Sequence, residues 1–260
     1  MSHPISEILS VLEKAYPYEG KESFDNCGLL VGARNMEASR VLVSLDITDA
    51  VIQEAVEKGA SLILSHHPLF FAEDLKTVTD DTPIGRKVLN LVTRSIAAIC
   101  MHTNADAADE GVNDMLADAF GLLDRVSLGG GDSGRIGRVG ELPKEWDIDS
   151  FAAEVKAVLD APGVRYLSIG RPVRRLAVGG GACGGMIDLA VNAGADTFLT
   201  SDVRYHQWQQ AREAGIHLLD AGHFSTENLI CRRFYDLLSH AFPDLCLEIS
   251  QVNRDFCRFV

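Results

Sequence analysis

The sequence predicts an α/β protein built from two similar α/β lobes, each with a mixed, mainly parallel sheet. Three observations indicate this class. Short apolar runs alternate with segments of helical period along most of the chain, as expected for βαβ units. A glycine-rich stretch at 127–147 interrupts this pattern near the middle of the chain. The same order of strands and helices then returns in the second half.

The first half begins with a helical pattern at 1–16 and continues with strands and helices in alternation. Asp49 and Gly59 are the expected cap and end of one helix, because these residue types favour those positions. Residues 1–126 form the expected first lobe, with part of the C-terminal segment packing onto it. Its further elements are strands at 28–32, 40–48, 61–65 and 95–101, and helices at 49–59, 84–94 and 111–121.

The second half, residues 127–260, forms the expected second lobe. Its glycine-rich beginning is either a connection or a set of strands that cross between the two halves. The expected elements are helices at 149–160, 184–193, 203–214 and 223–240, and strands at 164–169, 174–179, 197–201, 217–221 and 245–250.

Composition limits the classes of partner and compartment. The 260 residues include 24 basic and 37 acidic side chains, a net charge of −13, without a Lys/Arg block that would follow phosphates. This balance argues against a nucleic acid partner. Six scattered cysteines without a C-x-x-C pair indicate reduced thiols. No secretory leader pattern and no apolar run of about 20 residues is present, so we expect a cytoplasmic protein without membrane contact.

A faint internal repeat places polar side chains after apolar strands. The segments 57–67, 192–202 and 213–223 each run from a helix end through glycine and a strand into residues that can bind metals. Ligands bind at the carboxyl ends of parallel strands. The repeat would therefore bring His66, His67, Asp202 and His223 to one edge, although chance similarity between βα units is an equal alternative.

Two adjacent histidines, His66 and His67, end the strand at 61–65. Neighbouring residues of an extended strand point to opposite sides, so both rings converge only if the strand stops. Pro68 favours such a stop because it has no N–H for a further ladder hydrogen bond.

Two further clusters contain histidine and carboxylate. After the strand at 95–101, His102, Asn104 and Asp106 occupy alternate positions and would share one side of an extended loop. His223 and Glu227 would face the same way if a helix begins there. Each cluster also has a plain interpretation as a loop or helix cap. Together, their imidazoles and carboxylates match Zn, Mn, Fe, Co or Ni, and they suit two metals bridged by a carboxylate.

Five motifs resemble, in order, those of the Nif-three-like family, whose bacterial members are often named GTP cyclohydrolase 1 type 2 homologues. The resemblance spans nearly the whole chain and indicates the short bacterial form without an inserted domain. Three small departures, Cys27, Ala105 and Ser201, remove no ligand. The motifs are FDNCGLLVG (24–32), SHHPLFF (65–71), HTNADAADEGVND (102–114), SDVRYH (201–206) and DAGHFSTEN (220–228).

The resemblance implies a dinuclear metal site between the lobes, with two divalent ions per chain, and a ring-shaped homohexamer. His102 and His206 match positions that line this site, in an acid/base or supporting role, and Asp25 and Asn26 match a motif close to it. The implied metal ligands are His66, His67, Asp106, His223 and Glu227.

Two classes of function follow. The first is a metal-dependent hydrolase that activates water for attack on a nucleotide-like or phosphorylated small molecule. The second is a non-catalytic protein that stores or delivers metal or binds a regulatory partner. A purely structural metal clamp predicts saturated coordination, whereas five ligands for two ions leave open positions. The glycine-rich run at 178–185, which contains Cys183, is read as a tight βα turn in preference to a phosphate cradle.

Overall fold

The computed structural model describes all residues from Met1 to Val260. Contacts divide the chain into two compact units. Unit 1 consists of Met1–Asp109 and Ile230–Arg254, and unit 2 of Glu110–Leu229 and Asp255–Val260. The division after Asp109 differs from the expected one after residue 126, because α5 (Val112–Ala119) packs against β8 (Ile136–Trp146) of unit 2. No helix combines the length and apolar character that a membrane crossing requires.

Unit 1 is built on a five-stranded sheet in the order β13-β4-β5-β6-β2, in which only β2 runs antiparallel to its neighbour. A short antiparallel pair, β1 and β3, lies outside this sheet. The strands are β1 (His3–Pro4), β2 (Gly28–Val31), β3 (Glu37–Ala38), β4 (Arg40–Ser44), β5 (Leu62–Ser65), β6 (Ala97–Cys100) and β13 (Cys246–Ile249). The helices are α1 (Ile5–Ala15), η1 (Tyr18–Gly20), α2 (Asp49–Lys58), α3 (Pro83–Thr93), α4 (Thr103–Ala107) and α10 (Leu229–Ala241).

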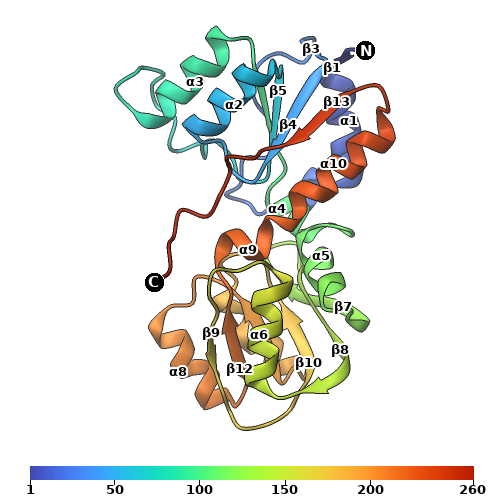
Figure 1. The fold of residues 1–260 in the computed structure, drawn as a ribbon, viewed down its shortest axis with the longest axis vertical. Helices are drawn as coiled ribbons and strands as arrows, with labels where there is room; N and C mark the ends of the chain where they lie inside the picture. The colour runs from blue at the N-terminus through green and yellow to red at the C-terminus, as the bar shows by residue number, and fades with distance from the viewer. The chain divides into compact units, whose positions relative to one another are not determined.

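Helices cover both faces of the unit 1 sheet, with α2 and α3 on one side and α1 and α10 on the other (Figure 1). Alternate strand residues such as Leu42 and Ile63 join the apolar core under α2 and α3. On α2 the cap is Thr48, which accepts a hydrogen bond from Val51 N, one residue before the expected Asp49. Gly59 ends this helix in the left-handed conformation, as expected.

Unit 2 is built on a six-stranded sheet in the order β7-β8-β10-β11-β12-β9. The central strands β10, β11 and β12 are parallel, and the outer pairs are antiparallel. The strands are β7 (Leu123–Gly130), β8, β9 (Arg165–Leu167), β10 (Val173–Val178), β11 (Thr197–Thr200) and β12 (His217–Asp220). The helices are α5, α6 (Ile148–Val158), η2 (Gly184–Met186), α7 (Ile187–Asn192), α8 (Tyr205–Ala214) and α9 (His223–Glu227).

The unit 2 sheet is also covered on both faces. Residues of α5 and α6 pack with Leu176 and Leu199 on one face, and residues of α7 and α8 pack with Ala177 and Phe198 on the other. The glycine-rich stretch at 127–147 is mostly part of the antiparallel pair β7 and β8 in this one sheet. The α/β class with mixed sheets is therefore confirmed.

The expected strand at 40–48 and the expected helix at 223–240 are wrong in their extent. The strand at 40–48 ends at Ser44, whose hydroxyl donates to Asp46 O and closes a turn. The helix at 223–240 is two helices, α9 and α10, which are separated at Asn228. The strands of the internal repeat also lie in two different sheets, β5 in unit 1 and β11 with β12 in unit 2. The repeat therefore does not bring its polar residues to one sheet edge.

Candidate metal centre

The parallel strands of unit 1 end side by side. Ser44 pairs with Ser65, and Ser65 pairs with Cys100, so the carboxyl ends of β4, β5 and β6 are level. The residues that follow these strands are therefore delivered to the same edge of the sheet. They include Asp46 after β4, His66 and His67 after β5, and His102 after β6.

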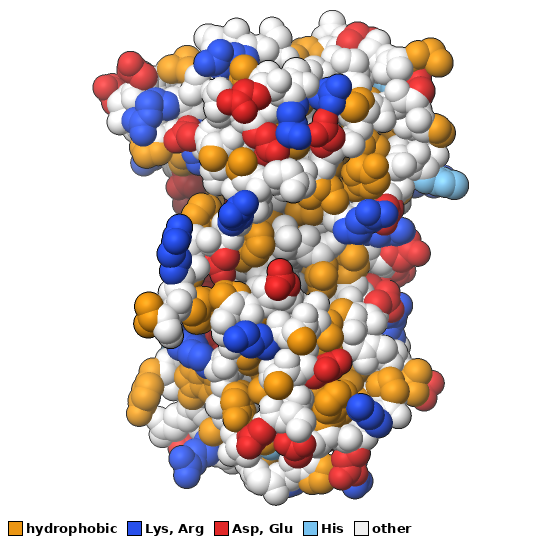
Figure 2. All heavy atoms as spheres, viewed as in Figure 1, with side chains coloured by type: hydrophobic (Ala, Val, Ile, Leu, Met, Phe, Trp, Pro, Cys, Tyr) orange, Lys and Arg blue, Asp and Glu red, His pale blue; other side chains and the backbone are white.

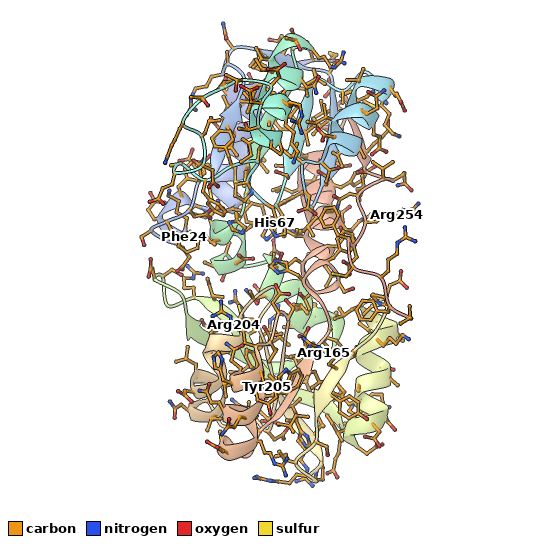
Figure 3. The ribbon with its side chains drawn as sticks, turned by 90° about the vertical axis from the view of Figure 1, so that its left-hand side faces the viewer. Phe24, His67, Arg165, Arg204, Tyr205 and Arg254 are labelled. Atoms are coloured by element: carbon orange, nitrogen blue, oxygen red, sulfur yellow. The ribbon has the colours of Figure 1, made fainter.

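Four of the expected site residues come together at this edge and form the unit 1 cluster, His66, His67, His102 and Asp106. The ring centroids of the three histidines lie 5.1 to 5.5 Å apart. A nitrogen of each ring lies within 4.8 Å of the others. The strand β5 stops at Ser65, as expected before Pro68, so the adjacent imidazoles of His66 and His67 can both join this cluster. Figure 3 shows the position of His67.

Each imidazole of the unit 1 cluster is oriented through its Nδ1 atom. His66 Nδ1 lies 2.9 Å from Met101 O, His67 Nδ1 lies 2.8 Å from Asp46 Oδ1, and His102 Nδ1 lies 2.9 Å from Asp25 Oδ1. Carbonyl and carboxylate oxygens only accept hydrogen bonds, so each Nδ1 carries the hydrogen. The Nε2 lone pair of each neutral ring is thereby presented as a metal ligand.

Asp25 is the most constrained of these acceptors, and its side chain has no exposed surface. Its oxygens accept hydrogen bonds from Asn26 N, the Cys27 thiol, Thr103 N and the Thr103 hydroxyl, besides His102. Burial raises the pKa of Asp25, but the hydrogen bonds from His102, Thr103 and Cys27 outweigh it and hold the pKa well below its usual range. Asp25 is therefore an anion at neutral pH.

Asp106 reaches the cluster from a helix. The expected extended loop after His102 is wrong, because 103–107 form α4 and Asp106 N donates to His102 O. Asn104 consequently points elsewhere and donates to Tyr16 O. His66 Nε2 lies 3.6 Å from Asp106 Oδ1, which is too long for a hydrogen bond. Two tetrahedral ligands of one zinc ion lie about 3.4 Å apart, so this spacing suits a shared metal.

Unit 2 carries a second donor set at the end of β12, the unit 2 pair of His223 and Glu227. α9 begins at His223, as its spacing requires, and His223 Nε2 lies 2.9 Å from Glu227 Oε2. His223 Nδ1 lies 2.6 Å from Asp202 Oδ2, which follows the neighbouring strand β11. Glu227 is 3% exposed, and a buried carboxylate needs a compensating partner such as an imidazole or a cation.

The glycine-rich run after β10 forms the floor beneath this pair. Gly181 has φ +65°, and a β-carbon there would collide with Glu227 Oε1 and approach His223 Nε2 to 3.2 Å. Its N–H donates to Thr226 Oγ1, and Gly180 N donates to Asn113 Oδ1. Protein acceptors thus occupy these amides, which supports the tight turn over the phosphate cradle. The Cys183 thiol donates to Gly180 O.

A pocket of about 370 Å³ opens beside His223 within unit 2. Arg165, labelled in Figure 3, lines it and pairs with Asp220. His206 lies exposed on α8 and belongs to none of the groups of side chains that could hold a metal ion. The pocket is lined by Gly163, Arg165, Asp202, Asp220, Gly222, His223, Asp255, Cys257 and Phe259.

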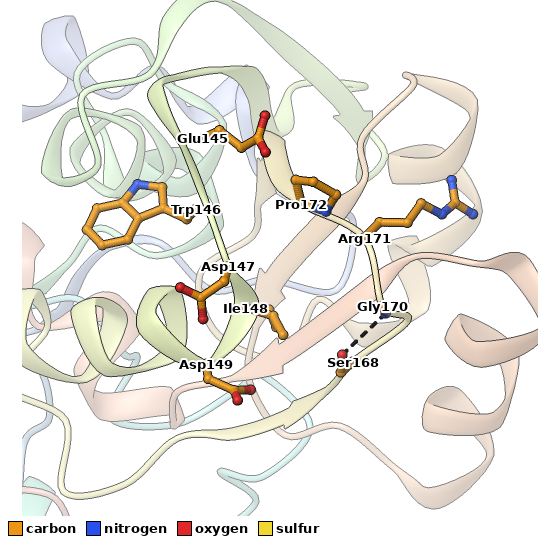
Figure 4. A pocket seen from close by; sticks show the side chains of 9 residues that line it. All are labelled: Glu145, Trp146, Asp147, Ile148, Asp149, Ser168, Gly170, Arg171 and Pro172. Carbon is orange, nitrogen blue, oxygen red and sulfur yellow. Dashed lines mark hydrogen bonds between the residues drawn. The ribbon is translucent and has the colours of Figure 1, made fainter.

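A second pocket, of about 390 Å³, lies in unit 2 away from this pair (Figure 4). Its carboxylates are already engaged: Glu145 pairs with Arg174, Asp147 caps α6, and Asp149 accepts from the Tyr166 hydroxyl. On the face seen in Figure 2, basic and acidic side chains are interspersed without an extended basic area. Neither feature indicates a further charged ligand.

The donor chemistry of both sets fits a divalent transition metal. Imidazole nitrogens and carboxylate oxygens are the ligands of zinc and its neighbours in the first transition row. Metal-binding histidines usually donate their other N–H to a carboxylate or carbonyl, as His66, His67 and His223 do. Asp46 is a supporting residue that the sequence motifs did not single out. Its position just after a strand end, like those of His66 and His102, is the feature that could have indicated it.

The fold and these donor sets define a two-unit α/β protein in which each sheet carries histidine and carboxylate side chains at its carboxyl edge. The chain belongs to the Duf34/NIF3 (NGG1p interacting factor 3) family, whose model matches residues 3–255. A GTP cyclohydrolase 1 type 2 homolog of Clostridium perfringens is 36% identical over 229 residues, 86% of each chain. The homolog of Streptomyces coelicolor is 38% identical over 232 residues, 86% of this chain and 81% of that one.

A solved structure shows the same fold. The crystal structure of a Bacillus cereus protein related to NIF3 matches with a TM-score of 0.92 and 25% identity, and it covers 99% of both chains. The expected family resemblance is thus confirmed by sequence and by fold.

Proposed function

We propose that the protein is a dinuclear metal-dependent hydrolase resembling GTP cyclohydrolase 1 type 2. The unit 1 residues His66, His67 and Asp106 and the unit 2 pair would together hold two divalent ions of zinc, iron, manganese, cobalt or nickel. The observation that carries the proposal is the matched orientation of the donors. In each unit, a carboxylate accepts a hydrogen bond from the Nδ1 atom of an imidazole: Asp46 from His67, and Asp202 from His223. A second carboxylate then lies near an imidazole Nε2 atom: Asp106 near that of His66, and Glu227 near that of His223.

Bound metal ions would lower the pKa of water and polarise the bond under attack. The residues of this chain supply the remaining functions. Asp46 and Asp202 orient their imidazoles, and His102 and His206 are the candidates for holding and moving a proton. The pocket beside His223 lies within the usual range of small-molecule sites. A nucleotide-like or phosphorylated small molecule is the proposed substrate class, and the names of the relatives support it.

Elemental analysis of the purified, untagged protein tests the metal centre. We expect about two metal ions per chain in the wild type and loss of most metal in both His67→Ala and Glu227→Ala. His240→Ala is the matched control, because His240 is exposed on α10 outside the donor sets. Retention of both ions in Glu227→Ala would contradict the ligand assignment.

Hydrolysis of nucleotides and phosphoesters by the metal-loaded protein tests the catalytic part. His206→Ala is expected to keep its metal and lose hydrolysis. Full metal occupancy without turnover of any such substrate would favour the alternative function of metal storage, delivery or regulatory partner binding. We also propose the homohexameric ring that the family resemblance implies. Light scattering would then give six times the chain mass of 28.2 kDa.

A further inference from the structure

We propose that His102 is a metal ligand, so that His66, His67 and His102 form a three-imidazole face in unit 1. The inference rests on the proposed metal-binding function and deepens it. The family resemblance implies that His102 lines the site or acts as an acid or base. In unit 1, however, the His102 ring has the same spacing and the same kind of Nδ1 contact as His66 and His67, the two imidazoles assigned as ligands.

The distances between the three rings support this assignment. The centroid of the His102 ring lies 5.2 Å from that of His66 and 5.5 Å from that of His67, and those two lie 5.1 Å from each other. The three rings therefore form a nearly equilateral group. One nitrogen of each ring lies within 4.8 Å of a nitrogen of the other two, so His102 offers a ligand atom to the same cluster as the two assigned imidazoles.

The orientation of the His102 ring also matches that of a metal ligand. A histidine that binds metal through Nε2 usually donates its Nδ1 hydrogen to a carboxylate or carbonyl. His66 does so to Met101 O, and His67 does so to Asp46. His102 follows the same pattern with Asp25, at 2.9 Å. In all three rings, Nε2 is therefore the nitrogen that can bind a metal ion.

The His102 ring is also held rigidly by its partner Asp25. Asp25 accepts five hydrogen bonds in total, two of them from Thr103 in the first turn of α4 and two from the neighbouring Asn26 N and Cys27 thiol. β2 places this motif beside His102, because Gly28 pairs with Cys100 at the end of β6. The carboxylate cannot follow a moving imidazole without breaking these bonds. A fixed ring suits a ligand better than a group that swings towards a substrate.

The proposal has a chemical consequence. A neutral imidazole from His102 would add a ligand without compensating the charge of a divalent ion, and uncompensated charge is what lowers the pKa of zinc-bound water to about 7 in catalytic sites. Asp106 beside His66 would remain as a carboxylate ligand. His206 would remain as the candidate for proton transfer.

Metal affinity tests the proposal directly. Zinc or cobalt is added to chelator-stripped full-length protein, and its dissociation constant is measured by competition with a chromophoric chelator. Loss of a supporting hydrogen bond typically weakens metal binding about 10- to 100-fold. We expect His102→Ala and His102→Gln to exceed this range, with Asp25→Asn inside it and His240→Ala unchanged. Unchanged affinity in a folded His102→Gln protein would overturn the proposal.

A second measurement uses the wild type alone, in case the variants do not fold. Diethyl pyrocarbonate modifies accessible imidazole nitrogens, and mass spectrometry reads each site. Zinc should protect His102 as strongly as His67 and leave His240 reactive. Protection of His67 without protection of His102 would overturn the ligand role while leaving the proposed function intact. A wild type that binds no zinc in the competition assay would overturn both.

Discussion

His67 Nδ1, just beyond the end of β5, lies 2.8 Å from Asp46 Oδ1, just beyond the end of the neighbouring strand β4. The two residues come from loops that follow parallel strands in register. In the two donor sets this is one of three pairs in which a carboxylate accepts a hydrogen bond from an imidazole Nδ1; the others are Asp25 with His102 and Asp202 with His223.

The Asp46 contact predicts an effect on metal affinity without loss of a ligand. Asp46→Ala should weaken metal binding about 10- to 100-fold, the usual effect of removing a supporting partner. Asp46→Asn should lose less, because its amide oxygen still accepts from His67 Nδ1. Chelator competition measures both. Equal affinity in wild type and Asp46→Ala would show that the contact does not orient a ligand.

Replacing Gly181 by alanine should lower both the stability of the protein and its metal content. At φ +65° an alanine is strained, and its β-carbon would also collide with the buried Glu227 carboxylate. Gly59 is the matched control, because it has φ +67° and nothing within 4 Å of an added β-carbon. Gly59→Ala should cost about 1–2 kcal/mol from backbone strain alone. Gly181→Ala should cost more and displace metal, as urea unfolding and elemental analysis would show; equal costs and normal metal content would contradict the close approach.

A buried ion pair in unit 2 predicts a large stability effect away from the donor sets. Arg138 Nε lies 2.6 Å from Asp114 Oδ1, and both side chains are less than 10% exposed. Asp114→Ala leaves the guanidinium without this carboxylate and should lower the free energy of unfolding by about 3–5 kcal/mol. Glu145→Ala, at the exposed pair with Arg174, should cost less than about 1 kcal/mol. Denaturant unfolding of the metal-free protein compares them.

The same pair predicts a pH dependence. Burial raises the pKa of Asp114, but the Arg138 hydrogen bond, the Glu110 N–H and the charges of Arg138 and Arg125 outweigh it and lower the pKa. A lowered folded-state pKa gives stability that is present above the unfolded value of about 3.9 and is lost as the pH falls through the folded value. Below about pH 4, the stability difference between wild type and Asp114→Asn should therefore shrink. A difference that stays constant between pH 6 and pH 3 would contradict this assignment.

The sequence predicted most strands and helices because their apolar periods and caps act locally. Pro68 after two histidines predicted the strand stop, and the spacing of His223 and Glu227 predicted one helical turn. The loop after His102 failed because alternate polar residues suggested an extended segment, whereas α4 forms there with its first turn tied to Asp25. This hydrogen bond comes from a residue far away in the chain, so the local sequence pattern could not predict it.

The residue types that end the parallel strands can be read from the sequence alone, and they predict imidazoles and carboxylates at a sheet edge. Which of these side chains meet depends on the fold. The register that aligns Ser44, Ser65 and Cys100 joins Asp46 to His67, and the antiparallel β2 brings Asp25 to His102. Strand order and register arise from packing between distant segments, so the orientation of each ring, and with it the three-imidazole face, depends on contacts that no short stretch of sequence contains.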